Sequence, residues 1–305
     1  MREYLNYNSP QALKSFLKEN GLAAQKKFGQ NFLVNGNAAK KMIDFLDIKP
    51  RMSVWEIGAG LGAVTKEILL READLTVFEI DYGFSEVLFK FFEDYVKSDR
   101  LKIIKGDVLK TWKAYFNGHK IPDRVFGNLP YNIAATFIAD TISEKVIFEK
   151  AVFTVQKEVA QRMRAKAKSA EYSSFSVLCQ IAYDVKSVMN LSGSNFWPVP
   201  NVESRTVLMT KKADFQRFSG KDFDFFLVVL RAIFSQRRKT IKNNLISDPA
   251  LIRLLKSKGD FQISRIAESA LEKTNIAAEQ RAENLEAEQI LSLSRAVESV
   301  IMAQV

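Results

Sequence analysis

The sequence predicts an α/β protein in which a doubly wound parallel sheet is followed by a small all-helical domain. Between residues 53 and 155, short apolar segments typical of buried strands alternate with segments whose apolar residues recur at helical spacing. Strands that are separated by helical crossovers pair in parallel, with helices on both faces of the sheet. After Lys212, apolar residues recur at helical spacing alone, as in Phe223, Phe226 and Leu230, which predicts the helical domain.

The predicted elements divide the chain into three parts. A short helix with Ser9 as its N-cap and Pro10 in its first turn belongs to an N-terminal extension, residues 1–25. The sheet domain covers residues 26–212 and the helical domain residues 213–305. We expect strands at 53–58, 75–80, 101–106, 124–127 and 151–155, helices at 64–71, 86–96 and 133–143, and a terminal antiparallel hairpin formed by 182–189 and 206–210.

Composition excludes several kinds of chemistry. The 305 residues contain one cysteine, Cys179, and one histidine, His119, so we expect no disulfide, no metal site and no Ser-His-Asp catalysis. The chemistry should therefore depend on an organic cofactor. There is no secretory signal and no apolar run of spanning length, so we expect a cytoplasmic protein that does not contact membranes. The net charge of +10 favours a polyanionic partner.

A glycine-rich loop follows the first predicted strand. The sequence Gly58-Ala59-Gly60-Leu61-Gly62 lets the backbone turn tightly and approach a ligand that a Cβ atom would exclude. Glu79 ends the second strand, where an acid can accept hydrogen bonds from both ribose hydroxyls, and Asp107 ends the third, where it can contact an adenine amino group. A tight turn alone would explain an isolated loop of this kind. The two acids favour a nucleoside-bearing cofactor, which could be NAD or S-adenosylmethionine.

The motif Asn128-Leu129-Pro130-Tyr131 follows the fourth strand, at the same edge of the sheet. An exocyclic adenine amine is a poor nucleophile because its lone pair is delocalised into the ring. The Asn128 side-chain oxygen and the Leu129 carbonyl could accept hydrogen bonds from the amine and free that lone pair, while Pro130 fixes the turn. Tyr131 offers a face on which the base could stack. Asn and Pro are also common in surface turns. At this position in a nucleoside-binding sheet, however, we predict methyl transfer to an adenine flipped out of its helix.

A second aromatic residue, Phe196, lies in the Pro-rich segment Phe196-Trp197-Pro198-Val199-Pro200. We predict that this rigid loop holds the Phe196 ring over the target base. Simple packing of the ring against the sheet is the alternative.

Together, these motifs resemble the ribosomal RNA adenine N6,N6-dimethyltransferase family, most closely its bacterial small-subunit members. The similarity spans nearly the whole chain and is concentrated in segments 27–33, 56–62, 79–81, 106–109, 127–133, 155–160, 196–204, 234–240 and 281–285. It implies a Rossmann-like S-adenosylmethionine-dependent methyltransferase domain. It also implies dimethylation of two adjacent adenosines in a hairpin near the 3' end of small-subunit ribosomal RNA, within a pre-assembled 30S subunit, by an enzyme that we expect to be monomeric.

The resemblance also assigns roles in cofactor binding. Asn31 and Leu33 would border the methionine part of the cofactor, with Gly58 and Gly60 in the loop beside it, Glu79 on the ribose and Asp107 on the adenine. Asn128 would serve both cofactor and target amine. At Ala59 the family usually has proline, so the turn is less rigid here. This difference bears on the affinity for the cofactor and not on the identity of the reaction.

Two clusters of basic residues predict an RNA surface, because neutralising phosphates gives affinity independent of sequence. A solvated helix face would explain either cluster as well. The absence of acids around the second favours RNA contact there. The predicted RNA-binding residues are Arg162 and Arg164 in the first cluster and Arg237, Arg238, Lys239 and Lys242 in the second.

Three other functions compete with this interpretation. A macrolide-resistance enzyme would use the same fold and chemistry on large-subunit ribosomal RNA, but the 236–240 and 281–285 segments favour the small subunit. A non-catalytic ribosome assembly factor would not need the intact 128–131 motif. A NAD-dependent dehydrogenase would need a hydride-transfer partner, and the sequence offers none.

Overall fold

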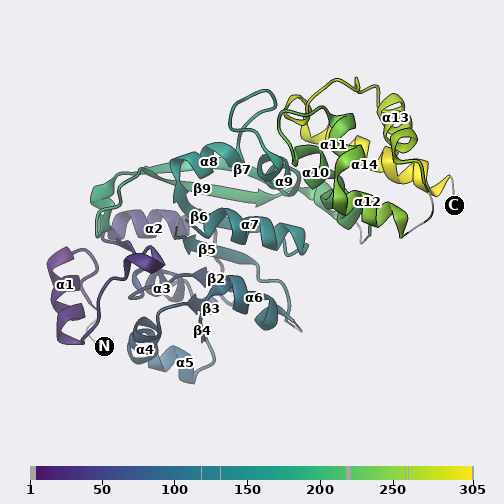
Figure 1. Cartoon of the computed structure of the whole chain (residues 1–305). Helices are drawn as coiled ribbons and strands as arrows, with labels where there is room; N and C mark the ends of the chain where they lie inside the picture. The colour runs from purple at the N-terminus through teal and green to yellow at the C-terminus, as the bar shows by residue number, and fades with distance from the viewer. Residues whose placement is uncertain are drawn as a thin grey trace. The chain divides into compact units, whose positions relative to one another are not determined.

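The computed structural model describes residues 5–117, 119–130, 132–217, 221–257, 259 and 261–303. It divides into two compact units (Figure 1). Unit 1 comprises residues 1–160 and 184–211, and unit 2 comprises residues 161–183 and 212–305.

A seven-stranded sheet forms the centre of unit 1, with the order β4-β3-β2-β5-β6-β9-β7. The five strands from β4 to β6 in this order are parallel, and β9 pairs antiparallel with β6. The strands are β2 (Ser53–Ile57), β3 (Asp74–Glu79), β4 (Leu101–Lys105), β5 (Arg124–Asn128), β6 (Lys150–Gln156), β7 (Tyr183–Leu191) and β9 (Ser204–Lys211). A separate two-stranded sheet pairs β1 (Phe32–Leu33) antiparallel with β8 (Phe196–Trp197). The prediction of a doubly wound α/β fold is confirmed.

Helices precede, connect and follow the parallel strands of unit 1. They are α1 (Pro10–Glu19), α2 (Gly36–Asp44), α3 (Ala63–Leu69), α4 (Tyr82–Phe91), α5 (Glu93–Lys97), α6 (Val108–Phe116), α7 (Ala134–Ser143) and α8 (Lys157–Met163), the last of which crosses into unit 2. Their caps agree with the sequence. The Ser9 hydroxyl accepts a hydrogen bond of 3.1 Å from the Ala12 backbone N–H at the start of α1, as predicted.

Unit 2 is helical. It contains α9 (Ser174–Ala182), α10 (Lys221–Phe234), α11 (Ile241–Ser247), α12 (Pro249–Lys256), α13 (Ile263–Lys273) and α14 (Ala287–Met302). Its core is apolar, and Phe223, Ile233, Ile290 and Ile301 are each at most 1% exposed. Short 3-10 helices complete the chain at η1 (Lys26–Phe28), η2 (Gly193–Asn195), η3 (Ala213–Arg217) and η4 (Ala282–Asn284).

The division between the units differs from the one expected from the sequence, which gave residues 161–183 to the sheet domain. This segment groups with the C-terminal helices because its polar contacts lie there. The Tyr172 hydroxyl donates a hydrogen bond of 2.9 Å to the Leu285 carbonyl, and the Lys168 backbone N–H donates one of 2.7 Å to the Glu283 carbonyl. Residues 5–25, expected as a separate extension, are part of unit 1.

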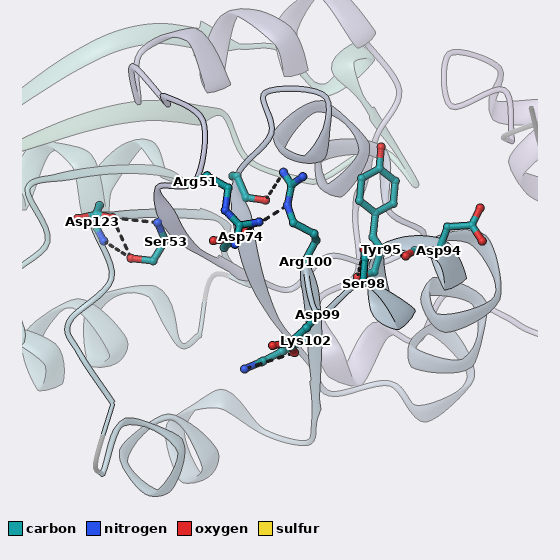
Figure 2. A network of polar contacts seen from close by, with 11 residues as sticks. Arg51, Ser53, Asp74, Asp94, Tyr95, Ser98, Asp99, Arg100, Lys102 and Asp123 are labelled. Atoms are coloured by element: carbon teal, nitrogen blue, oxygen red, sulfur yellow. Dashed lines mark hydrogen bonds and ion pairs between the residues drawn. The ribbon is translucent and has the colours of Figure 1, made fainter.

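Polar contacts fix the amino ends of the central strands, opposite the edge that carries the predicted site. Figure 2 shows Asp123, just before β5, accepting hydrogen bonds of 2.9 Å from both the backbone N–H and the hydroxyl of Ser53 in β2. Asp74 at the start of β3 forms ion pairs with Arg51 at 3.0 Å and Arg100 at 3.1 Å (Figure 2). These contacts hold β2, β3 and β5 in register, so that their carboxyl ends meet at one edge. Within the described ranges, no helix is long and apolar enough to cross a membrane.

Candidate active site

A pocket of about 720 Å³ lies at the carboxyl ends of β2, β3 and β5. Strand order reverses between β2 and β5, since the chain runs from β2 to β3 and β4 on one side and from β5 to β6 on the other. Doubly wound sheets bind ligands at such a switch point. Six of the seven predicted cofactor residues line this pocket: Asn31, Leu33, Gly58, Gly60, Glu79 and Asn128.

The seventh, Asp107, lines an adjoining pocket of about 550 Å³. The two pockets share Phe28, Gly58, Ile80 and Pro130 in their walls. Asp107 also caps α6, because its carboxylate accepts a hydrogen bond of 3.0 Å from the Leu109 backbone N–H. The structure thus brings the predicted nucleoside-binding residues to one continuous edge of the sheet.

The glycine-rich loop has the backbone conformation that requires glycine. Gly58 and Gly60 have φ values of +74° and +55°, in the left-handed region that disfavours other residues. A Cβ atom at Gly60 would also lie 3.2 Å from the Phe32 ring. The loop therefore leaves its backbone accessible at the pocket edge, where a ligand can approach it.

The Glu79 side chain, at the end of β3, contacts both this loop and Asp81, the N-cap of α4. Its carboxylate accepts a hydrogen bond of 2.8 Å from the Gly60 N–H and another of 2.9 Å from the Asp81 N–H. Burial raises the pKa of Glu79 to about 7, against the lowering effect of these backbone donors. A carboxylate oxygen has two lone-pair sites, so each oxygen can accept a further hydrogen bond from a ligand hydroxyl.

Glu56 in β2 is a site residue that the sequence analysis did not single out. Its side chain lines the pocket and is 1% exposed, and it accepts a hydrogen bond of 2.6 Å from the Thr65 hydroxyl. Burial raises the pKa of Glu56 to about 8, and the charge of Glu79 adds to this effect. An acidic residue inside an otherwise apolar strand was the available signal, because buried carboxylates cluster at functional sites.

Asn128 ends β5 beside the glycine loop. Its side-chain Nδ2 donates a hydrogen bond of 3.0 Å to the Asn31 backbone carbonyl. This bond orients the amide, so that the other end, Oδ1, is its acceptor atom. The next residue, Leu129, is buried, and its backbone N–H donates a hydrogen bond of 3.2 Å to the Thr154 carbonyl in β6. Pro130 packs under Gly29, where a Cβ atom would lie 3.2 Å from the Pro130 Cβ.

Tyr131 and Phe196 are the two residues predicted to stack on the target base. Tyr131 lies outside the described residues. Phe196 lies in β8, is 3% exposed and packs in the hydrophobic core of unit 1, and it is not in the wall of either pocket. Its partner across the two-stranded sheet is Leu33, which does line the pocket. The structure therefore does not bring the Phe196 ring to the base position; in this conformation it packs against the sheet.

The predicted RNA-binding residues lie in unit 2, and several of them have protein partners. Arg237 forms an ion pair of 2.7 Å with Glu283 and donates a hydrogen bond of 2.8 Å to the Ala170 carbonyl. Lys242 forms an ion pair of 2.7 Å with Glu268.

The sequence around Arg237 and Lys242 lacks acids, but folding supplies acids from distant segments. Arg162 is half-buried, with its guanidinium 5.4 Å from the centre of the Phe175 ring. Arg164 and Arg238 are exposed, and Lys239 is half-buried.

The pocket fits a cationic nucleoside such as S-adenosylmethionine. The loop offers backbone that a Cβ atom would cover, and acids stand at the ends of β3 and β4 where ribose and adenine would bind. Buried Glu56 lines the same pocket, and a positively charged ligand bound there would favour its ionised form.

Comparisons with known proteins identify the family. The Ribosomal RNA adenine dimethylase family matches residues 21–298. A curated relative, Ribosomal RNA small subunit methyltransferase A of Treponema denticola, is 43% identical over 95% of this chain and 94% of its own length. The crystal structure of a dimethyladenosine transferase from Plasmodium falciparum is similar with a TM-score of 0.71, at 27% identity over 86% of this chain and 95% of that one.

The fold is shared more widely. The crystal structure of the 23S rRNA methyltransferase ErmE is similar with a TM-score of 0.60, covering 88% of this chain and all of that one, at 20% identity. That likeness shows the fold alone. The match to the family covers most of the chain, and the relative from Treponema denticola extends over nearly all of it. The chain therefore belongs to the ribosomal RNA adenine dimethylase family and is a methyltransferase that uses S-adenosylmethionine.

Proposed function

We propose that this enzyme dimethylates N6 of two adjacent adenosines in a hairpin near the 3' end of small-subunit ribosomal RNA. The family gives the reaction, and the curated relative's name points to the small subunit. We further propose that the substrate is a pre-assembled 30S subunit, that the enzyme acts as a cytoplasmic monomer, and that the methylation is a step of ribosome biogenesis. The net charge of +10 suits such a polyanionic substrate.

The observation that carries this proposal is the orientation of Asn128. Because its Nδ2 is bound to the Asn31 carbonyl, Oδ1 is presented as a hydrogen-bond acceptor at the pocket edge. In the proposed mechanism, Asn128 Oδ1 and the Leu129 carbonyl accept hydrogen bonds from the target amine. They draw its nitrogen toward tetrahedral geometry and so localise the lone pair. Pro130 fixes the turn, and Tyr131 would stack on the base.

The cofactor, when bound, supplies an electrophilic methyl group on a sulfonium. We assign Asn31 and Leu33 to its methionine end, Gly58 and Gly60 to the backbone beside it, Glu79 to the ribose and Asp107 to the adenine. All of these residues line the two adjoining pockets. Asn128 borders both cofactor and amine, so it places the nucleophile beside the methyl donor.

Unit 2 is our candidate for the RNA-binding part. Arg164, Arg238 and Lys239 have no ion pair among the described residues, and they are the basic side chains we expect on phosphates. We propose a structural role for Arg237 and Lys242, whose charges are paired with Glu283 and Glu268. Arg162 lies over Phe175 and is expected to contribute less.

Methylation of purified ribosomal subunits tests the proposal. Small and large subunits from cells that lack this modification are incubated separately with the enzyme and labelled S-adenosylmethionine, and the RNA is analysed by mass spectrometry. We expect two N6,N6-dimethyladenosines in the small-subunit RNA and no label in the large-subunit RNA. Label in large-subunit RNA alone would support the second candidate, a large-subunit methyltransferase with the same fold and chemistry. Failure to label either subunit would favour an assembly factor without activity.

A further inference from the structure

Residues that precede the family match contribute to the wall of the pocket. The match begins at residue 21, yet Tyr7 and Leu13 line the pocket together with the glycine loop. Tyr7 also lines a neighbouring polar pocket of about 680 Å³, which shares Leu33 and Ala63 with the first. The Tyr7 side chain therefore stands at the end of the cofactor site assigned to the methionine part.

Hydrogen bonds hold this segment against the pocket wall. The Tyr7 hydroxyl donates a hydrogen bond of 3.0 Å to the backbone carbonyl of Leu61, inside the glycine loop. The Asn8 side-chain Oδ1 accepts one of 2.7 Å from the Gly36 N–H at the start of α2. Leu61 lines the cofactor pocket and Gly36 lines the neighbouring polar pocket, so the segment is anchored at the walls of both.

Apolar packing completes the attachment. Leu13 and Leu17 of α1 are 1% and 3% exposed, and they share a cluster with Phe32, Phe84 and Leu61. Helix α1 has ten residues, too few to be stable by itself in water. It is therefore held in place by this packing, and Leu13, Phe32 and Leu61 of the same cluster line the pocket.

Polar contacts extend this attachment to the predicted ribose acid. Gln25 and Gln30 donate hydrogen bonds of 2.8 Å and 3.1 Å from their side-chain amides to the Asp81 carboxylate. The backbone N–H of Asp81 donates in turn to Glu79. These hydrogen bonds join the segment that follows α1 to the end of β3 that carries Glu79.

We propose that residues 5–20 form a strap over the cofactor site, and that Tyr7 contacts the methionine end of the cofactor and slows its release. This inference rests on the cofactor site assigned above. The Tyr7 hydroxyl fastens the strap to the glycine loop, and the ring covers the pocket edge. Loss of the hydroxyl removes one hydrogen bond from the closed state, which corresponds to roughly a 2- to 10-fold faster opening.

Dissociation rates measured on the full chain test the strap. Tyr7→Phe, Tyr7→Ala and wild type are loaded with S-adenosylmethionine or S-adenosylhomocysteine, and release is followed by stopped-flow displacement, with calorimetric Kd values alongside. We expect Tyr7→Phe to release both ligands about 2- to 10-fold faster and Tyr7→Ala to release them faster still. Tyr82→Phe is the matched control, because this tyrosine is 67% exposed and outside the pocket, and it should behave as wild type.

A second readout does not depend on the substitutions. Hydrogen exchange of the α1 amides should slow when either ligand is added to wild type. Wild-type release rates in both Tyr7 variants, with binding intact, would overturn the strap and leave the cofactor site standing. Absence of any binding to wild type would overturn the cofactor assignment itself, and the strap with it.

Discussion

The Asn128 side chain donates a hydrogen bond of 3.0 Å to the backbone carbonyl of Asn31, which lies 97 residues earlier in the chain. This bond joins the loop that precedes β1 to the end of β5. It fixes which end of the Asn128 amide is the acceptor, and the proposed chemistry depends on that choice. The loop that contains Asn31 and the strand end that contains Asn128 are far apart in the sequence, but they lie together in the site.

Substitution of Asn128 by alanine should abolish methyl transfer without unfolding the protein. The substitution removes the acceptor for the target amine, and loss of one such preorganised group typically costs about 10²- to 10³-fold in kcat. Asn128 is half-buried at a strand end, so the fold should persist. Single-turnover methylation of small subunits measures the loss, with circular dichroism as the folding control. Turnover near the wild-type rate would refute the role of Asn128.

Stability in the absence of cofactor should fall as pH rises from about 4.5 to 8. Burial raises the folded-state pKa of Glu56 to about 8 and of Glu79 to about 7, from an ordinary value of 4.5. In this window the folded state holds more protons than the unfolded chain, so raising the pH favours unfolding. The two protonated acids make their full contribution to stability below pH 4.5. This contribution is lost as the pH rises through their folded-state pKa values of about 7 and about 8.

Chemical denaturation at several pH values measures this slope. Glu56→Gln keeps an acceptor for the Thr65 hydroxyl but cannot ionise. It should therefore flatten the profile and be more stable than wild type at pH 8, by roughly 4 kcal/mol. An unchanged slope in Glu56→Gln would show that this carboxyl does not titrate in that range.

The adjacent arginines Arg237 and Arg238 should behave differently when each is replaced by alanine. Arg237→Ala removes the ion pair with Glu283 and the hydrogen bond to the Ala170 carbonyl, so unfolding should become easier by about 1 kcal/mol. Arg238→Ala removes an exposed charge with no ion pair among the described residues and should leave the melting temperature unchanged.

RNA binding at several salt concentrations completes this comparison. Arg238→Ala should weaken binding to the subunit and reduce the slope of log K against log salt by about 0.7–0.9. Equal effects of the two substitutions on both stability and RNA affinity would contradict the division of roles.

Replacing Ala59 by proline should tighten cofactor binding. Proline restricts the loop between Gly58 and Gly60 before binding, which typically contributes about 0.4–1 kcal/mol, or 2- to 5-fold in Kd. Calorimetry with S-adenosylmethionine measures the change, and Ala59→Ser serves as a control that does not restrict the backbone. Weaker binding by the proline variant would contradict this prediction and would show that the cofactor requires a backbone conformation at residue 59 that proline prevents.

The sequence by itself determined the elements and the edge at which they meet. Apolar segments of strand length alternating with helical patterns gave every parallel strand of the sheet to within two residues at each end, because side-chain periodicity is a local property. The Gly58–Gly62 loop, Glu79 and Asn128 could be placed together from the sequence because each lies at the carboxyl end of a strand, and parallel strands end at a common edge.

Only the tertiary structure decided which distant groups meet. Residues 161–183 group with the C-terminal helices through Tyr172, Arg237 is paired with Glu283, Phe196 is in the core, and Tyr7 reaches the glycine loop. None of these contacts leaves a periodic trace in the sequence. They depend on how packed elements place side chains that lie tens or hundreds of residues apart, and the burial of Glu56, with its raised pKa, follows from the same packing.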